Sequence, residues 1–334
     1  MMRGLKVLTS EGEAGEPQLR DLPDDEGTAG LHHRHPVHLH HYRFRLRTEG
    51  TVRFPAFPGP ALRGALGDQR DVYAAFFRPP PALPQKRFAD PPRPIALHPR
   101  FGAGTYGPGS ALELDVILAG SAGAHIATLL RGLARVGEQG VGADRRPATG
   151  AGTFTVERVD AHGPAGTHPI VTPDGWVRLS PAPWTYPHDF AAPAPTARTL
   201  TLRLHTPTHV RRGPDPRGSH TFADLVEDLL QRLSLLSQAY GPGPAHTRDE
   251  ERALAAAAAE VTIDDAALRW EEVPRYSRRQ ERPMTFGGWT GWVRYRIPEH
   301  TPAPYLPLLR AARLLHAGKH TAFGFGAVEL DEHE

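Results

Sequence analysis

Two stretches of this sequence resemble each other, and the resulting internal repeat restricts the folds open to the chain more than any other feature. The first stretch covers residues 111–159 and the second covers residues 291–330. Each predicts a strand, a loop, an amphipathic helix, a glycine-rich turn and a last strand. The matching positions are Leu-Leu-Arg at 129–131 and 308–310, and Gly152 and Gly326. The separations, 152 − 129 = 23 and 326 − 308 = 18, place about five additional residues in the turn of the first copy.

The residues before each copy also correspond. An alternating strand at 42–47 leads to a helix at about 60–77, and an alternating strand at 199–205 leads to a helix at 222–240. In the second half, two further strands at 261–272 and 289–297 flank a basic connection. Both halves therefore predict the order βαββαβ, an α+β chain of two tandem ferredoxin-like (RRM-like) domains. Such a domain leaves one face of its sheet free, and nucleic-acid-binding domains use that face.

The predicted boundaries follow from this repeat. Residues 1–40 form a loosely ordered leader, acidic and then His-rich, and residues 41–165 form the N-terminal ferredoxin-like domain. A Pro-rich linker covers 166–197, because proline cannot join the interior of a sheet. Residues 198–334 form the C-terminal domain with the glycine-rich loop.

Composition excludes several classes of protein. The chain of 334 residues fits two domains of about 150 residues. Its apolar runs fall short of the roughly 18 residues that a membrane span needs, so we expect no membrane partner. There is no cysteine, which excludes disulfides and thiolate chemistry and suits a cytoplasmic location. The positive charge is almost entirely arginine, which binds phosphate well but is also favoured by a GC-rich genome.

Two segments suit contact with a phosphate backbone. The glycine-rich turn places Gly318, Gly324 and Gly326 around Lys319 and His320, so that the backbone can approach a phosphate closely. The alternative is that these glycines only end a helix and turn the chain.

The second segment is the basic connection at 275–283, which includes Arg275, Tyr276, Arg278 and Arg279. Its charges favour an RNA clamp in which Tyr276 stacks on a base or donates its phenolic proton. The alternative is a solvated hairpin tip.

Six histidines crowd the segment from His32 to His41. Histidines two apart can chelate a metal, but Pro36 breaks the geometry and no acidic residue lies nearby. We therefore predict no metal site here and favour a flexible, tag-like tract, with catalysis by His40 or His41 left open.

Four motifs occur in this order: FPGPALRGALG after the first strand, LRLHTPTHVRR at the start of the second domain, RYSRRQ, and the terminal GKHTAFGFG. Together they resemble the CRISPR repeat-processing endoribonucleases of the RAMP superfamily. The resemblance implies two ferredoxin-like domains, CRISPR repeat RNA or crRNA as partner, and no metal or nucleotide cofactor. It also implies cleavage by the 2′-OH of the substrate, which leaves a 2′,3′-cyclic phosphate. Such a reaction needs a base, an acid and cations on the phosphate.

The sequence departs from this family in its first helix, where many relatives place a catalytic histidine. No histidine occurs between His41 and His98. The expected proton-transfer residues are therefore His40, His41, His320 and Tyr276. The expected RNA contacts are Arg63, Arg211, Arg212, Arg278, Arg279, Gly318, Lys319, Gly324 and Gly326.

Two other functions stay open at this stage. One is a non-catalytic subunit that holds guide RNA beside other CRISPR effector subunits, and the other is a His-rich metal-binding protein. A monomer and a homodimer are both compatible with the sequence, and it does not reveal which repeat is recognised.

Overall fold

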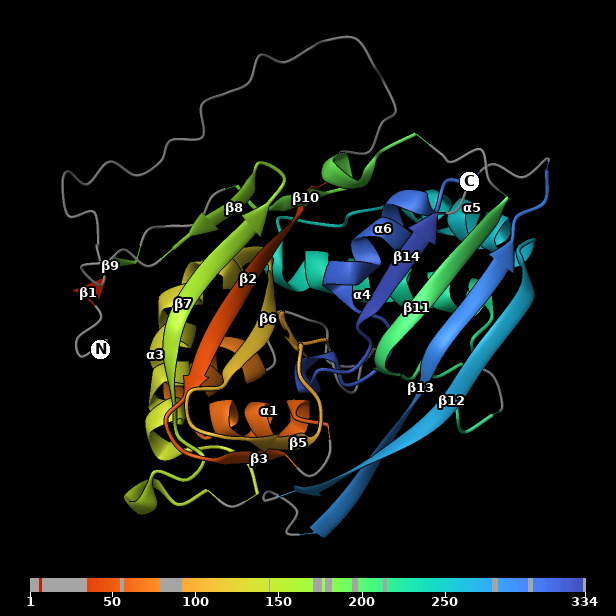
Figure 1. Ribbon diagram of the computed structural model, residues 1–334. Helices are drawn as coiled ribbons and strands as arrows, with labels where there is room; N and C mark the ends of the chain where they lie inside the picture. Colours follow the sequence, from red (N-terminus) through yellow and green to blue (C-terminus); the bar gives the residue numbers. More distant parts are fainter. Residues whose placement is uncertain are drawn as a thin grey trace, which may run out of the picture.

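The computed structural model describes residues 6–7, 35–54, 57–78, 92–143, 145–170, 176–177, 182–193, 198–212, 215–277, 282–299 and 303–332. Within them the chain forms two sheets, each with helices packed on one face (Figure 1). A short parallel pair joins β1 (Lys6–Val7) to β9 (Trp176–Val177).

The N-terminal sheet has the order β4-β6-β2-β7-β8 and is antiparallel throughout. Its strands are β2 (Val37–Thr48), β4 (Ile95–Pro99), β6 (Ala111–Ala119), β7 (Phe154–Gly163) and β8 (Gly166–Pro169). A side ribbon pairs β3 (Val52–Phe54) with β5 (Gly104–Tyr106). One face is covered by α1 (Gly59–Gly67), α2 (Arg70–Val72), the π-helical turn η1 (Tyr73–Phe77) and α3 (Ile126–Gln139), which follows the 3-10 turn η2 (Gly120–His125).

The C-terminal sheet has the order β12-β13-β11-β14 and is also antiparallel. Its strands are β11 (Thr199–Thr208), β12 (Thr262–Ser277), β13 (Arg282–Arg296) and β14 (Val328–Glu332). Its helices are α4 (Phe222–Tyr240), α5 (Arg248–Ala259) and α6 (Leu306–Leu315). In both sheets the first strand of the repeat lies between the third and the fourth, which confirms the predicted tandem ferredoxin-like fold.

The two domains pack asymmetrically. Leu39, Ala96 and Ile117 lie on the face of the N-terminal sheet opposite its own helices, because strand residues alternate between faces. They belong to the same hydrophobic cluster as α4 and α6 of the C-terminal domain. These helices therefore lie between the two sheets (Figure 1), and one end of the N-terminal sheet's open face is used for domain packing rather than left free.

Three segments differ from the sequence prediction. The expected helix at 60–77 is divided, because Gln69 has an extended backbone with ψ of 114° between α1 and α2. Strand β2 begins at Val37, inside the predicted leader, because Val37 and Leu39 are buried. The predicted linker contributes β8 and β10 (Trp184–Tyr186), which pair with β7 and β2 and are followed by the 3-10 turn η4 (His188–Phe190).

Candidate nucleic-acid interface

The C-terminal glycine-rich loop begins where α6 ends and runs to Gly326, through the 3-10 turn η5 (Thr321–Phe323). Gly318, Gly324 and Gly326 have φ of 74°, 89° and 75°, a region that favours glycine. Their amides are all used inside the protein: Gly318 donates to Asp228, Gly324 to the carbonyl of Thr321, and Gly326 to the carbonyl of Pro207. The glycines therefore shape the loop, and their own amides are not available to a ligand.

The first helix holds this loop in place. At the start of α1, a Cβ added to Gly59 would lie 1.8 Å from the carbonyl oxygen of Phe323. On the other side, the amide of Lys319 donates to the carbonyl of His209, 3.1 Å away, just after β11. The loop is thus wedged between the two domains.

Aromatic and cationic side chains gather where the loop meets α1 and the β12–β13 hairpin. The ring of His320 stacks on Phe286 with centroids 3.8 Å apart. The guanidinium of Arg275 lies 4.9 Å from the centre of the Phe286 ring and 4.7 Å from that of Phe323. Arg63 reaches the same Phe323 ring from α1, at 5.2 Å, and lies 3.4 Å over Phe77. Loop, helix and hairpin therefore present two arginines and a histidine together.

Arg63 and Arg275 form no ion pair within the described ranges, and the Nε atom of each is buried without a hydrogen-bond partner there. Burial lowers the pKa of Arg63 to about 10; the charges of Arg93 and Arg275 act in the same direction, and Tyr73 and Asp68 oppose them. Burial also lowers the pKa of Arg275. Because a desolvated guanidinium without a carboxylate is costly, the site is suited to an anion that comes from outside the protein.

Comparison with known proteins shows what the two halves of the chain resemble. Residues 202–328 match the family model described as CRISPR-associated endoribonuclease Cas6, and a second model, described as an N-terminal domain, matches residues 68–182. The second half of the chain is thus similar to the Cas6 family. No curated protein matches it significantly.

Solved Cas6 structures share the fold of this chain. A Thermus thermophilus Cas6 matches with a TM-score of 0.51 and 19% identity, over 88% of this chain and 99% of that one. The product complex of that Cas6 gives a TM-score of 0.54 and 20% identity, over 88% and 99%. A partial Cas6-RT-Cas1–Cas2 complex gives 0.57 and 11%, over 90% of this chain and 47% of that one.

The two neighbouring histidines of β2 point to opposite faces of the sheet. His40 lies on the helix-covered face, stacked on Tyr42 and against Gly123. Burial, helped by His38, lowers the pKa of His40 to about 4. His41 lies on the open face, 3.5 Å from Asp115, with its ring stacked on that of His162. Of these two histidines, only His41 is therefore available to a ligand on the open face.

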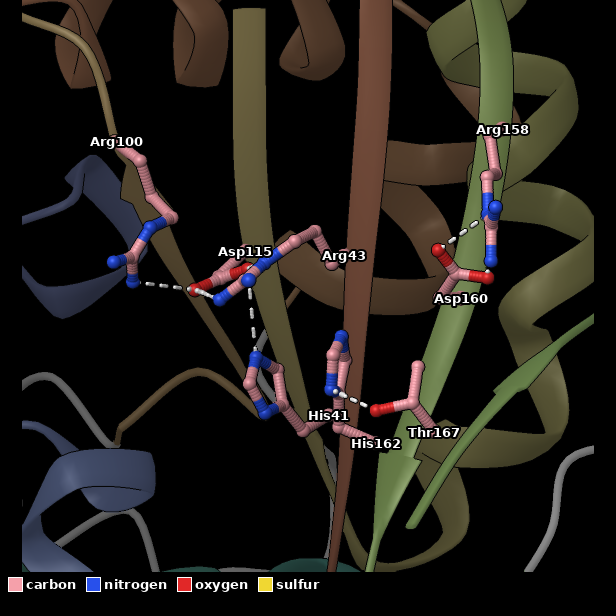
Figure 2. Close-up of polar contacts among 8 residues, drawn as sticks. All are labelled: His41, Arg43, Arg100, Asp115, Arg158, Asp160, His162 and Thr167. Atoms are coloured by element: carbon pink, nitrogen blue, oxygen red, sulfur yellow. Dashed lines mark hydrogen bonds and ion pairs between the residues drawn. The ribbon is translucent and has the colours of Figure 1, made fainter.

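Asp115 organises that face through its contacts with neighbouring side chains (Figure 2). Arg43 donates two hydrogen bonds to its carboxylate, at 2.7 and 3.0 Å, and Arg100 donates one at 3.2 Å. Burial alone would raise the pKa of Asp115, but its contact with His41 and the hydrogen bonds from Arg43 hold it well below its usual range. Arg43 and Arg100 are therefore neutralised, unlike Arg63 and Arg275.

The free face of the C-terminal sheet is neutralised in the same way. Its side chains pair as Arg203 with Asp331, His205 with Glu329, Arg294 with Asp264 and Asp265, and Arg296 with Asp264. Arginines that already have carboxylate partners must lose them to bind phosphate. The face that the ferredoxin-like fold leaves free is consequently a poorer RNA surface than the loop.

The remaining predicted residues are distributed around the loop. Arg212 is paired with Glu227 of α4, and Arg211 is exposed two residues from the carbonyl that holds Lys319. Tyr276 is part of β12, opposite Pro283, but its side chain lies outside the described residues, as do Arg278 and Arg279.

Sequence reasoning missed Phe286 and Phe323, on which the basic side chains lie. Phe323 stands inside the recognised loop motif, and its place between His320 and Gly324 was the available signal. Phe286 had none, because only the pairing of β12 with β13 brings it to the loop.

The His-rich tract is described only from His35. There, His35 packs against Gly243 and donates its backbone amide to Pro244. Within the described ranges, no group of three or more His, Asp or Glu side chains could hold a metal ion. No described helix is long and apolar enough to cross a membrane.

Proposed function

We propose that this protein binds CRISPR repeat RNA and cuts it at the glycine-rich loop, without a metal ion, by attack of a ribose 2′-OH on the adjacent phosphate. The observation that carries this proposal is the pair of partly buried arginines, Arg63 and Arg275, which form no ion pair with another described residue and flank Phe323 beside His320. A phosphodiester supplies the missing negative charge, and a guanidinium binds it through two parallel hydrogen bonds.

The reaction forms a bond between the 2′ oxygen and phosphorus and breaks the bond from phosphorus to the 5′ oxygen. The products are a 2′,3′-cyclic phosphate and a 5′-OH. One group must accept the 2′-OH proton and another must protonate the leaving oxygen, while cations stabilise the charge on the phosphorane.

We assign one proton transfer to His320, because its ring is fixed on Phe286 next to Arg275. Tyr276, from the same hairpin, is the proposed second proton-transfer group. His41 is the alternative to His320, held by Asp115 on the open face. His40 is the weakest of the four predicted candidates, because it lies on the face that the helices cover.

The RNA contacts proposed around this centre are Lys319, Arg211, Arg212, Arg278 and Arg279. Gly318, Gly324 and Gly326 contribute by shaping the loop rather than through their amides. These cations attract a phosphate next to the loop whatever the base sequence of the RNA. Specificity must therefore come from the shape or the bases of the repeat.

A specific observation keeps a second function in view. The segment 59–77, where many relatives carry a catalytic histidine, has none, and Tyr73 is its exposed aromatic residue. A subunit that holds guide RNA without cutting it would have the same fold and the same cationic cluster.

The deciding experiment incubates the full-length protein with its cognate repeat RNA in excess EDTA and analyses the product ends. We expect one cut and a cyclic phosphate, at the same rate as in Mg²⁺. The single-turnover rate should fall about 100-fold or more in His320→Ala, with RNA affinity nearly unchanged. His188→Ala is the control, because that side chain is 86% exposed and contacts only its neighbour Asp189 in the described part of the chain.

Three other outcomes of the same assay would contradict parts of this proposal. Cleavage that stops in EDTA and returns with Mg²⁺ would disprove the metal-independent mechanism. Tight binding without cleavage would establish the guide-holding subunit instead. Full activity in His320→Ala with loss in His41→Ala would move the proton transfer to the Asp115 face.

A further inference from the structure

The internal repeat duplicates the glycine-rich loop as well as the fold. The first copy follows α3 and runs from Gly140 to Gly152, with a 3-10 turn, η3 (Pro147–Thr149), where the second copy has η5. The helices end in the same backbone conformation, with φ and ψ of 76° and 154° at Gly140 and of 59° and 154° at His316.

Hydrogen bonds place the two loops in register. The amide of Val141 donates to Gly152 as that of Ala317 donates to Gly326, both at 2.9 Å. Three further pairs of donors and acceptors correspond between the copies: Gly152 to Thr51 with Gly326 to Pro207, Ala143 to Arg53 with Lys319 to His209, and Thr149 to Arg146 with Phe323 to His320. By this register, Arg146 occupies the position of His320.

The register also corrects the predicted location of the additional residues. Between the Leu-Leu-Arg triplet and the end of the helix the counts are 140 − 129 = 11 and 316 − 308 = 8, so three additional residues belong to α3. Between the next matched pair they are 146 − 143 = 3 and 320 − 319 = 1, so two are inserted in the loop. One of these two is Arg145, immediately before Arg146.

The two loops differ in what covers them. In the second copy Thr321, Ala322 and Phe325 are buried. In the first copy Arg145, Arg146 and Thr149 are exposed. Within the described ranges neither Arg145 nor Arg146 forms an ion pair, whereas the arginines of the neighbouring sheet face, such as Arg43 and Arg47, are paired with carboxylates.

We propose that the first glycine-rich loop, residues 140–152, is a second binding site for RNA, which holds the phosphate backbone of a strand that flanks the repeat through Arg145 and Arg146. The site rests on the proposed RNA-binding function. The amides that correspond to those of the second loop, Val141, Ala143, Thr149 and Gly152, donate to carbonyls inside the protein, so we assign the contact to the guanidinium groups.

The chemistry of this site is narrower than that of the second loop. Residues 140–152 include no aromatic side chain, so the loop cannot stack a base. Binding here is therefore electrostatic and independent of the RNA sequence. It lengthens the stretch of RNA that the protein binds beyond the part that the second loop recognises.

The test measures binding of the full-length protein to the repeat RNA with and without a single-stranded oligo-U extension at either end. We expect one extension to tighten binding by wild type, and we expect Arg145→Ala/Arg146→Ala to lose that gain. The slope of log affinity against log salt should fall by about 1.4, which is two contacts of about 0.7 each for a single strand. Cleavage at saturating RNA should be unchanged.

Arg248→Ala/Arg252→Ala is the matched control, because it removes two exposed arginines from α5 of the other domain. Equal affinity and equal slope in wild type and in the loop variant would overturn this proposal and leave the proposed function intact. Absence of any repeat RNA binding by wild type would overturn both.

Discussion

The carbonyl oxygen of Phe323 faces Gly59 so closely that a Cβ there would lie 1.8 Å from it. Gly59 starts α1 in the first domain, and Phe323 belongs to the loop that follows α6 in the second. This contact explains why glycine occurs in the FPGPALRG motif, and it joins the helix that carries Arg63 to the loop that carries His320.

Replacing Gly59 should therefore separate the two halves of the site. In Gly59→Ala the new methyl group must displace backbone, and we expect a loss of about 1–3 kcal/mol in the free energy of unfolding. Urea unfolding measures the loss, and RNA affinity should fall with it.

Gly64→Ala is the control within the same helix. No atom lies within 4 Å of a Cβ at Gly64, so alanine should stabilise α1 by up to about 1 kcal/mol through its higher helix propensity. Equal stability changes in the two variants would show that the contact with Phe323 does not matter.

Asp115 should contribute to stability through its arginine partners. In Asp115→Asn, Arg43 and Arg100 lose their carboxylate, and we expect the free energy of unfolding at pH 7 to fall by about 1–3 kcal/mol. Because the pKa of Asp115 is lower in the folded state, this contribution is present above the unfolded value near 3.9 and is lost as pH falls below it. Wild type and variant should therefore converge in urea titrations below about pH 4.

The control for this prediction is Asp249→Asn, whose partner Arg252 is 75% exposed. Such a surface pair contributes little, so its loss should change stability by less than about 0.5 kcal/mol. A constant difference between wild type and Asp115→Asn from pH 7 to pH 3 would contradict the assigned charge state.

Periodicity and repetition were sufficient to predict both ferredoxin-like domains, because alternation and helical spacing are local signals. The helix at 60–77 was predicted without its break at Gln69, although Gly67, the last residue of α1, lies two residues before that position. The motif FPGPALRGALG and the terminal loop were recognised, but their contact through Gly59 and Phe323 depends on domain packing.

The candidate site could be predicted only in part from the sequence. Lys319 and His320 were predicted because their loop is a continuous motif. Arg275 was found only as part of a charged connection, and Phe286 was not found, because the pairing of two long strands decides which side chains face the loop. The carboxylate partners of Arg43 and Arg203 could not be predicted either, because they lie on neighbouring strands far apart in the sequence.

Two buried histidines should make the domain interface sensitive to acid. The ring of His98, from β4, lies 6.0 Å from that of His316, which follows α6. Burial lowers the pKa of His98 to about 4 and that of His316 to about 3. Between the unfolded value near 6.5 and these values, the unfolded chain binds protons that the folded chain does not. Stability should therefore decrease as pH falls from about 6.5 to about 4.

His98→Gln should weaken that dependence, because it removes one titrating group and leaves a polar side chain of similar length. Urea titrations at several pH values measure the slope, with His188→Gln as the exposed control. If His98→Gln kept the slope of wild type, the acid sensitivity would have to arise elsewhere.

Arg63 should weaken the fold slightly and strengthen RNA binding. Its guanidinium contacts the rings of Phe77 and Phe323, and its buried Nε has no hydrogen-bond partner among the described residues, so the desolvation of the charge is compensated only in part. Methionine fills a similar volume without charge, and we expect Arg63→Met to unfold at an unchanged or slightly higher temperature, because the lost cation–π contacts offset part of the gain. RNA affinity should fall about tenfold and the salt slope by about 0.7, since one phosphate contact disappears.

Arg63→Lys should recover part of the slope but less of the affinity, because lysine cannot form the bidentate contact. Arg252→Met, on the surface of α5, should change neither quantity. Wild-type affinity and slope in Arg63→Met would exclude this arginine from the RNA site.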